Sequence, residues 1–157
     1  MKIRIPEHLI RICRHALLGL AVIALWMTGA QQANAESTVV LIAAEGSGIE
    51  SISNRDIRRI FLGLKSADSD SVNKPVINLY NRQVYEDFLK NVMHMTEGAY
   101  KRKIVKRIFR HGTEEIREID MLDKLNEHLI NNVGDVSFVE EAAVENMHGI
   151  EVVKILW

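Results

Sequence analysis

Two short segments carry residue types that could bind a small oxyanion, and the first is Glu-Gly-Ser-Gly at residues 45–48. Ser47 offers a hydroxyl, while Gly46 and Gly48 leave backbone amides open to an anion. A glycine-rich segment after an apolar run is also an ordinary turn, and Glu45 would repel an anion. The segment is therefore a candidate oxyanion loop or a plain turn.

The second segment is Asn81-Arg82-Gln83-Val84, which opens a predicted helix. A helix N-terminus favours an anion, because its first amides are unpaired and the macrodipole is positive there. Arg82 could hold an oxyanion through two parallel N–H bonds. It could equally be a solvated arginine in the first turn.

Other reactive chemistry has little support in the residue pattern. The only cysteine is Cys13, and the sequence holds no G-x-S-x-G elbow and no G-x-x-x-x-G-K loop. Met93-His94-Met95 offers soft ligands that suit Cu(I), but neighbouring residues near a helix end rarely point the same way. We expect no catalytic residues, no metal site and no cofactor.

The first 35 residues have the pattern of a cleaved signal peptide. A basic start is followed by an apolar run over residues 16–30 and by Ala33-Asn34-Ala35, an A-x-A cleavage site. At ~1.5 Å per residue the run spans about 22 Å, short of the ~30 Å core of a bilayer. We expect residues 36–157 to be one periplasmic domain, not embedded in the membrane after cleavage.

The charge balance argues against a nucleic-acid partner. The whole chain has a net charge of −1 and the predicted leader carries +3, which leaves −4 for residues 36–157. A general nucleic-acid binder is usually basic.

Hydrophobic periodicity and turn residues predict the elements that must position these groups. Strands are expected at 37–44, 75–81, 135–141 and 150–157, with a loop at 64–74 and an ambiguous segment at 114–119. Helices are expected at 54–62, 82–93 and 97–110, and a last helix, capped by Asp120, should run to about 132. Alternating strands and helices predict a small α/β sandwich, with a mostly parallel sheet and helices on its faces.

The first helix has clear boundary signals. Ser53 and Asp56 have the spacing of a capping box, Ile57 begins an apolar stripe, and Gly63 suits a left-handed helix end.

The helix at 97–110 raises the question of a docking surface. Thr96 should cap it, with Tyr100, Ile104, Val105 and Ile108 facing inward. Its five cations on the other side could bind an acidic partner, or could be a solvated face that pairs with the acidic residues of 114–120. No aromatic residue lies between these cations, so a platform for single-stranded nucleic acid is unsupported.

Three segments in the same order resemble the periplasmic phosphate-binding proteins of ABC transporters and their shorter secreted relatives. "SISNRDIRRIFLGLKSA" resembles the family's L-S/T-x-x-Q-L-x-x-I-F-x-G signature, "PVINLYNRQVYEDFLKNVM" its strand, loop and helix, and "VGDVSFVEE" its G-A-I-G-Y-V strand. The resemblance implies a three-layer α/β sandwich like one lobe of a type II periplasmic binding protein. The family's R-x-x-G-S-G-T loop keeps only its arginine here, as Arg82.

The resemblance implies a solute-binding-like protein that holds phosphate or another small oxyanion, for ABC-type uptake or for sensing. The ligand-binding residues would be Ser47, Gly48, Ser53, Asn81 and Arg82. The alternative is a ligand-free periplasmic adaptor, not an enzyme, that contacts a membrane sensor, a transporter or an outer-membrane protein. Loss of the G-S-G-T residues favours this alternative.

Overall fold

The computed structural model describes residues 37–49, 51–64 and 71–157. The predicted leader and part of the predicted loop at 64–74 lie outside these ranges. Glu36–Trp157 forms one compact unit. Within the described ranges, no helix is long and apolar enough to cross a membrane.

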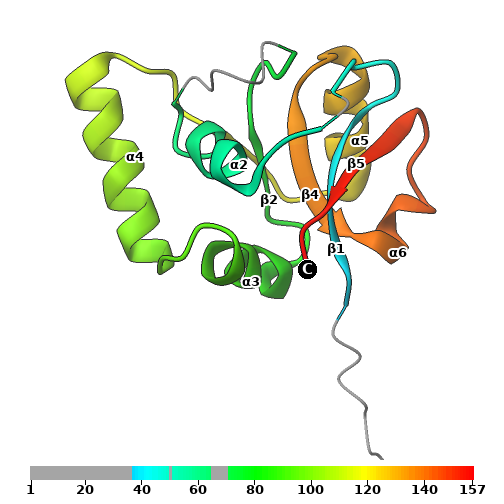
Figure 1. Cartoon of the computed structure of the whole chain (residues 1–157), viewed down its shortest axis with the longest axis horizontal. Coiled ribbons are helices and arrows are strands. Elements are labelled where there is room, and N and C mark those ends of the chain that lie inside the picture. The colour runs from blue at the N-terminus through cyan, green and yellow to red at the C-terminus, as the bar shows by residue number, and fades with distance from the viewer. Residues whose placement is uncertain (1–36, 50, 65–70) are drawn as a thin grey trace, which may run out of the picture. The chain divides into compact units, whose positions relative to one another are not determined.

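Strands and helices alternate along the unit, which confirms the α/β class (Figure 1). In chain order the elements are β1 (Val39–Ala44), α2 (Asn54–Ile60), β2 (Val76–Asn78), α3 (Arg82–Asn91), α4 (Glu97–His111), β3 (Arg117–Ile119), α5 (Leu122–Asn131), β4 (Val136–Glu140), α6 (Glu141–Val144) and β5 (Ile150–Ile155). The short helix α6 was not predicted, and β3 lies in the segment that the sequence left ambiguous. β2 is shorter than the predicted strand at 75–81.

The direction of β1 differs from the prediction. The strands form a three-stranded sheet in the order β4-β1-β5 and a two-stranded sheet of β2 and β3. β2 and β3 are parallel, but β1 runs antiparallel to both of its neighbours, so a mostly parallel sheet was wrong for this central strand. An apolar run that is buried on both faces gives no signal for its direction. Because β1 does not pair with β2, the parallel geometry of βαβ units does not constrain it.

Helices cover both faces of the sheet that contains β1, so the unit is a three-layer sandwich. Val39, Leu41 and Ala43 point into one core cluster, which α2 and α3 complete. Val40 and Ile42 point into a second cluster with α5. Figure 1 shows α2 and α3 on one side of β1 and α5 on the other.

Three phenylalanines fix the helices on the first face. The rings of Phe88 and Phe138 stack with centroids 3.9 Å apart, and Phe61 lies 4.8 Å from Phe88. Aromatic pairs add about 0.5–1.5 kcal/mol beyond their buried area. Tyr100 extends the cluster to α4, since its hydroxyl donates to the carbonyl of Phe61 at 2.7 Å.

Predicted helix ends are confirmed at α2 and α4. The amide of Gly63 bonds to the carbonyl of Ile60 and that of Leu64 to Arg59, as in a Schellman motif, with Gly63 at φ 69°. The hydroxyl of Thr96 accepts from the amide of Ala99 at 3.3 Å and so caps α4.

Two local predictions were wrong. Val105 does not face inward: half of it is exposed, because Tyr100 and Ile104 set the buried side and Val105 lies about 100° further round the helix. Asp120 does not cap α5, which begins after Met121 with no side-chain cap bond. Asp120 instead follows directly on β3.

A short junction connects β2 to β4. The amide of Asn73 donates to the carbonyl of Gly134 at 2.8 Å, and the amide of Val136 donates to the carbonyl of Lys74 at 3.0 Å. The carboxylate of Asp135 accepts from the amide of Lys74 at 3.1 Å. A parallel bridge between Pro75 and Val136 follows, so this junction brings the two sheets side by side.

We predict that Gly134→Ala destabilises this junction. A Cβ there would lie 2.7 Å from the side-chain amide nitrogen of Asn73 and 2.9 Å from the backbone carbonyl oxygen of Ser71, at a φ of +96°. Strain and overpacking together should lower the free energy of unfolding by about 2–4 kcal/mol, measured by urea denaturation. Gly112→Ala is the matched control, because φ there is +60° with nothing within 4 Å. Equal losses in the two variants would contradict the predicted close packing at Gly134.

Candidate functional site

Ser47 and Gly48 form a turn that is bonded to the chain itself. The hydroxyl of Ser47 donates to the carboxylate of Glu151 on β5 at 2.7 Å and accepts from the amide of Ile49 at 3.3 Å. Gly48 has a φ of +71° with nothing within 4 Å of a Cβ position. The hydroxyl that was expected to meet an anion therefore meets a carboxylate.

Ser53 is the N-cap of α2. Its hydroxyl accepts from the amide of Asp56 at 3.1 Å and also donates to the Asp56 carboxylate. The predicted box is thus closed by the side chains, and the carboxylate of Asp56 already lies at the N-terminus of α2. A second anion there would be repelled.

Asn81 caps α3 in the same way. Its side-chain oxygen accepts from the amides of Gln83 at 3.0 Å and Val84 at 3.4 Å. These are the amides that an oxyanion would need at this helix N-terminus. The sequence correctly predicted a helix N-terminus at this position. Its first amides are bonded to the side chain of Asn81, the residue immediately before the helix, and are not open to a ligand.

Arg82 binds two carboxylates of its own chain. Its Nε donates to Glu86 at 2.9 Å, and its guanidinium also pairs with Glu97 at the start of α4. The guanidinium carbon lies 5.3 Å from the centre of the Tyr85 ring. Arg82 therefore ties α3 to α4, and a ligand would have to compete with both carboxylates.

The five predicted residues do not converge on one site. Ser47 and Gly48 follow the carboxyl end of β1, which lies beside the start of β4. Asn81 and Arg82 follow β2, which runs parallel to β4 and has its carboxyl end beside the later part of that strand. Because β1 is antiparallel to β4, the loops after β1 and β2 leave the sheets at opposite ends.

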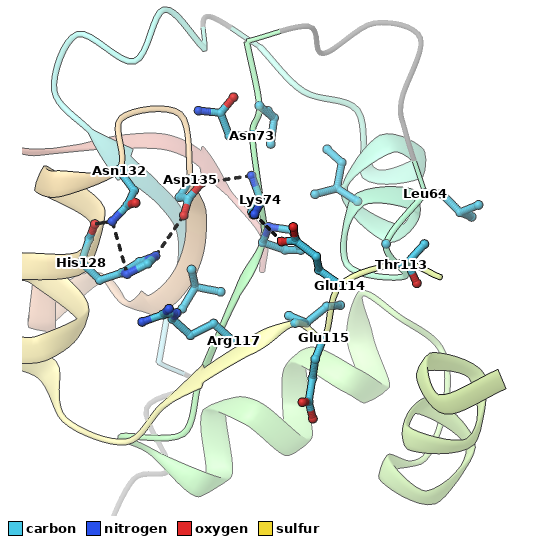
Figure 2. A pocket seen from close by; sticks show the side chains of 16 residues that line it. Leu64, Asn73, Lys74, Thr113, Glu114, Glu115, Arg117, His128, Asn132 and Asp135 are labelled. Atoms are coloured by element: carbon cyan, nitrogen blue, oxygen red, sulfur yellow. Dashed lines mark hydrogen bonds and ion pairs between the residues drawn. The ribbon is translucent and has the colours of Figure 1, made fainter. Parts of the chain in front are cut away.

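A cavity of about 640 Å³, which no sequence pattern indicated, lies beside the β2–β4 junction (Figure 2). Its walls come from α2, the segment before β2, the segment before β3 and the end of α5. The lining residues are Ile60, Gly63, Leu64, Val72, Asn73, Lys74, Pro75, Val76, Thr113, Glu114, Glu115, Ile116, Arg117, His128, Asn132 and Asp135.

The charged groups of this cavity are largely paired with one another. Lys74 forms an ion pair with Glu114, which raises the pKa of the lysine and lowers that of the glutamate. His128 Nε2 lies 2.9 Å from a carboxylate oxygen of Asp135, and both side chains are mostly buried. Asn132 approaches His128 Nδ1 at 3.4 Å. In Figure 2 the bonds from His128 to Asp135 and from Asp135 to Lys74 join α5 to the junction, and the Lys74–Glu114 pair continues to the segment before β3.

Arg117 on β3 differs from these groups because it is not paired with another described side chain. It lines the cavity and also a second hollow of about 400 Å³ between β3 and α5. Among the described residues, no side chain bonds to its guanidinium. Glu118, Asp120 and Glu127 line the second hollow together with Lys124, so its charged lining holds three carboxylates and two cations, Arg117 included.

The described residues hold no group of three or more histidine, cysteine, aspartate or glutamate side chains that could bind a metal. The side chains of Met93 and His94 lie in different environments, so they do not form a common metal site. Met93 is buried, while His94 has a φ of 53° and lies 3.4 Å from the guanidinium of Arg58.

Comparison with protein-family models gives no match, and comparison with curated proteins gives none either. The resemblance to phosphate-binding proteins therefore stays a prediction that depends on the three quoted segments.

Sequence patterns did not predict the cavity, nor most of the bonds that the expected ligand-binding residues make within the chain. Ser47 and Glu151 are 104 positions apart, and His128 and Asp135 lie on α5 and in the loop after it. The capping-box spacing of Ser53 and Asp56 and the i, i+4 spacing of Arg82 and Glu86 were the signals available in advance.

We predict that the Arg82–Glu97 pair can be measured by titration. Arg82 and Lys101 lower the pKa of Glu97 from 4.5 to about 2. A lowered pKa in the folded state stabilises the fold above pH 4.5, and this contribution is lost as the pH falls towards 2. In Arg82→Gln the pKa of Glu97 should rise towards 4.5, as followed by NMR of the carboxyl carbon.

Lys103→Gln is the control for this titration, because it removes an exposed cation of α4 that is not among the causes of the Glu97 shift. An unchanged Glu97 pKa in Arg82→Gln would show that Arg82 is not engaged with Glu97 and remains available to a ligand.

Proposed function

We propose that the protein is an exported, non-enzymatic adaptor, which acts by contacting another protein and not by holding a small oxyanion. The single observation that carries this proposal is the internal bonding of the expected ligand-binding residues. Ser47, Ser53, Asn81 and Arg82 each bond to their own chain, and three of the four bring or meet a carboxylate.

Electrostatics supports the adaptor over a phosphate receptor. An oxyanion at the start of α3 would displace Asn81 from the first amides and would have to separate Arg82 from Glu86 and Glu97. An anion at Ser47 would meet the carboxylate of Glu151. Each step removes an existing favourable contact, so little free energy is left for binding.

The paired groups also support a structural role over catalysis. The His128–Asp135 pair resembles two members of a catalytic triad, but Asp135 also bonds to the amide of Lys74 and His128 faces Asn132. These contacts fix α5 against the β2–β4 junction. The leader pattern at residues 1–35 supports export to the periplasm, where a membrane sensor, a transporter or an outer-membrane protein is a suitable partner.

Binding of a small anion in the cavity is the second candidate function. Arg117 favours it, since its guanidinium lines two hollows and bonds to no side chain among the described residues. Phosphate or a carboxylate could meet it there together with Asn132. The carboxylates of Glu114 and Asp135 line the same cavity and oppose an anion, which ranks this function second.

We predict a flat response when residues 36–157 are unfolded thermally against phosphate, sulfate, a phosphonate and chloride at matched ionic strength. This segment contains every described element and both core clusters. A ligand that binds only the folded state adds about 2.7 kcal/mol at a hundredfold excess over Kd, roughly ten degrees for a domain of this size. Millimolar anion should shift the midpoint by far less.

Two variants separate the outcomes of this experiment. A saturable, phosphate-selective shift in the wild type would overturn the adaptor proposal. Its loss in Arg117→Gln would assign the anion to the cavity, and its loss in Arg82→Gln would assign it to the start of α3. Matched ionic strength excludes general screening of surface charge as the cause.

A further inference from the structure

The helix α4 is held to the unit by one side only. Tyr100 is buried and bonds to the carbonyl of Phe61, and Ile104 packs against the core beside it. Thr96 caps the start of the helix and Gly112 ends it with a φ of 60°. In Figure 1, α4 lies beyond α2 and α3, away from the sheets.

The opposite side of α4 combines apolar and cationic side chains. Val105 and Phe109 are 50% and 86% exposed and lie four residues apart, so they are neighbours on one stripe. Helical geometry places Arg102 and Lys106 beside them, with Arg110 and Lys103 at the margin. We call this surface, made by Arg102, Lys103, Val105, Lys106, Phe109 and Arg110, the α4 face.

The cations of the α4 face lack acidic partners within the described part of the chain. Two acidic residues that flank these cations in the chain pair with other groups: Glu97 pairs with Arg82 and Lys101, and Glu114 pairs with Lys74. No ion pair joins a cation of the α4 face to a described carboxylate. The sequence left open whether these cations pair with the acidic residues of 114–120, and no ion pair of the α4 face with those described residues is formed.

We propose that the α4 face binds an acidic protein groove, with Phe109 inserted into an apolar pocket and the four cations meeting carboxylates on its rim. This inference rests on the proposed adaptor function and names the chemistry of its partner. Two apolar anchors at i and i+4 are the pattern by which an amphipathic helix enters a groove. An exposed aromatic residue among arginines has the composition of a binding hot spot.

The width of the stripe favours a protein groove over a membrane surface. Helices that lie in a bilayer interface present a broad apolar face that sinks into the acyl region. Here the apolar stripe is only Val105 and Phe109, with Arg102 and Lys106 directly beside it. The narrow apolar stripe and the positive charge beside it therefore favour an acidic protein groove as the occupant, and the test below distinguishes it from an anionic lipid surface and from a second copy of this chain.

The test measures binding of residues 36–157 to a labelled synthetic peptide by fluorescence anisotropy. The peptide is an acidic helix with leucine at i and i+4 and glutamate on both sides, and a matched peptide carries glutamine at every glutamate. We expect saturable binding of the acidic peptide only. Affinity should fall as salt rises from about 50 to 300 mM, because screening weakens contacts between exposed charges.

Variants assign the binding to the α4 face. Phe109→Ala should weaken binding at least about tenfold. The double variant Arg102→Gln/Lys106→Gln should weaken it by a similar factor at low salt, with a flatter salt dependence. Ile155→Ala, an exposed apolar residue on β5, and Lys90→Gln, an exposed cation on α3, are the matched controls and should leave affinity within about twofold. Thermal unfolding of each variant checks its fold.

Each other outcome overturns the proposal. Binding to phosphatidylglycerol vesicles without binding to the acidic peptide would make the occupant a membrane. Self-association in sedimentation that Phe109→Ala abolishes would make it a second copy. Equal binding of both peptides, or binding of neither, would remove the acidic groove. A flat anion series beside such a failure would leave the adaptor function standing, whereas a saturable anion shift would remove that function itself.

Discussion

β1 must bury side chains on both faces and complete hydrogen bonds on both edges, since all six of its residues are at most 3% exposed and it pairs with β4 and β5. The arrangement of the remaining elements depends on this strand. Its odd-numbered residues belong to the core cluster that holds α2 and α3 on one face, and Val40 and Ile42 belong to the cluster that holds α5 on the other. Its direction then decides at which end of the sheet the following loop emerges.

Local features of the fold could be predicted from the sequence. The 3.6-residue period gave α2, α3 and α4, and cap residues such as Ser53, Thr96 and Gly63 gave their ends. These signals succeed because a helix satisfies its hydrogen bonds within its own segment. The direction of β1 was not predictable, because six consecutive buried residues have the same pattern in a parallel or an antiparallel sheet.

The predicted oxyanion site was not found for a related reason. Ser47 and Arg82 have suitable chemistry for an oxyanion, but their availability depends on side chains that arrive from β5 and α4. No local pattern reports that Glu151 will lie beside Ser47. The cavity around Arg117 was missed because its walls come from four separate segments, which meet only at the β2–β4 junction.

The ion pairs that engage Arg82 and Lys74 also leave the cations of the α4 face without acidic partners among the described residues. Glu97 and Glu114 lie immediately before and after the cationic part of α4, where they could have neutralised it. Glu97 instead pairs with Arg82 of α3 and with Lys101 of α4, and Glu114 pairs with Lys74, which lies before β2. The positive charge of the helix therefore accumulates on the side that carries Phe109. Since Phe109 is 86% exposed, folding stability gains little from an aromatic residue there. An aromatic ring among four cations is thus better explained by an interaction made outside the chain than by the packing of its own core.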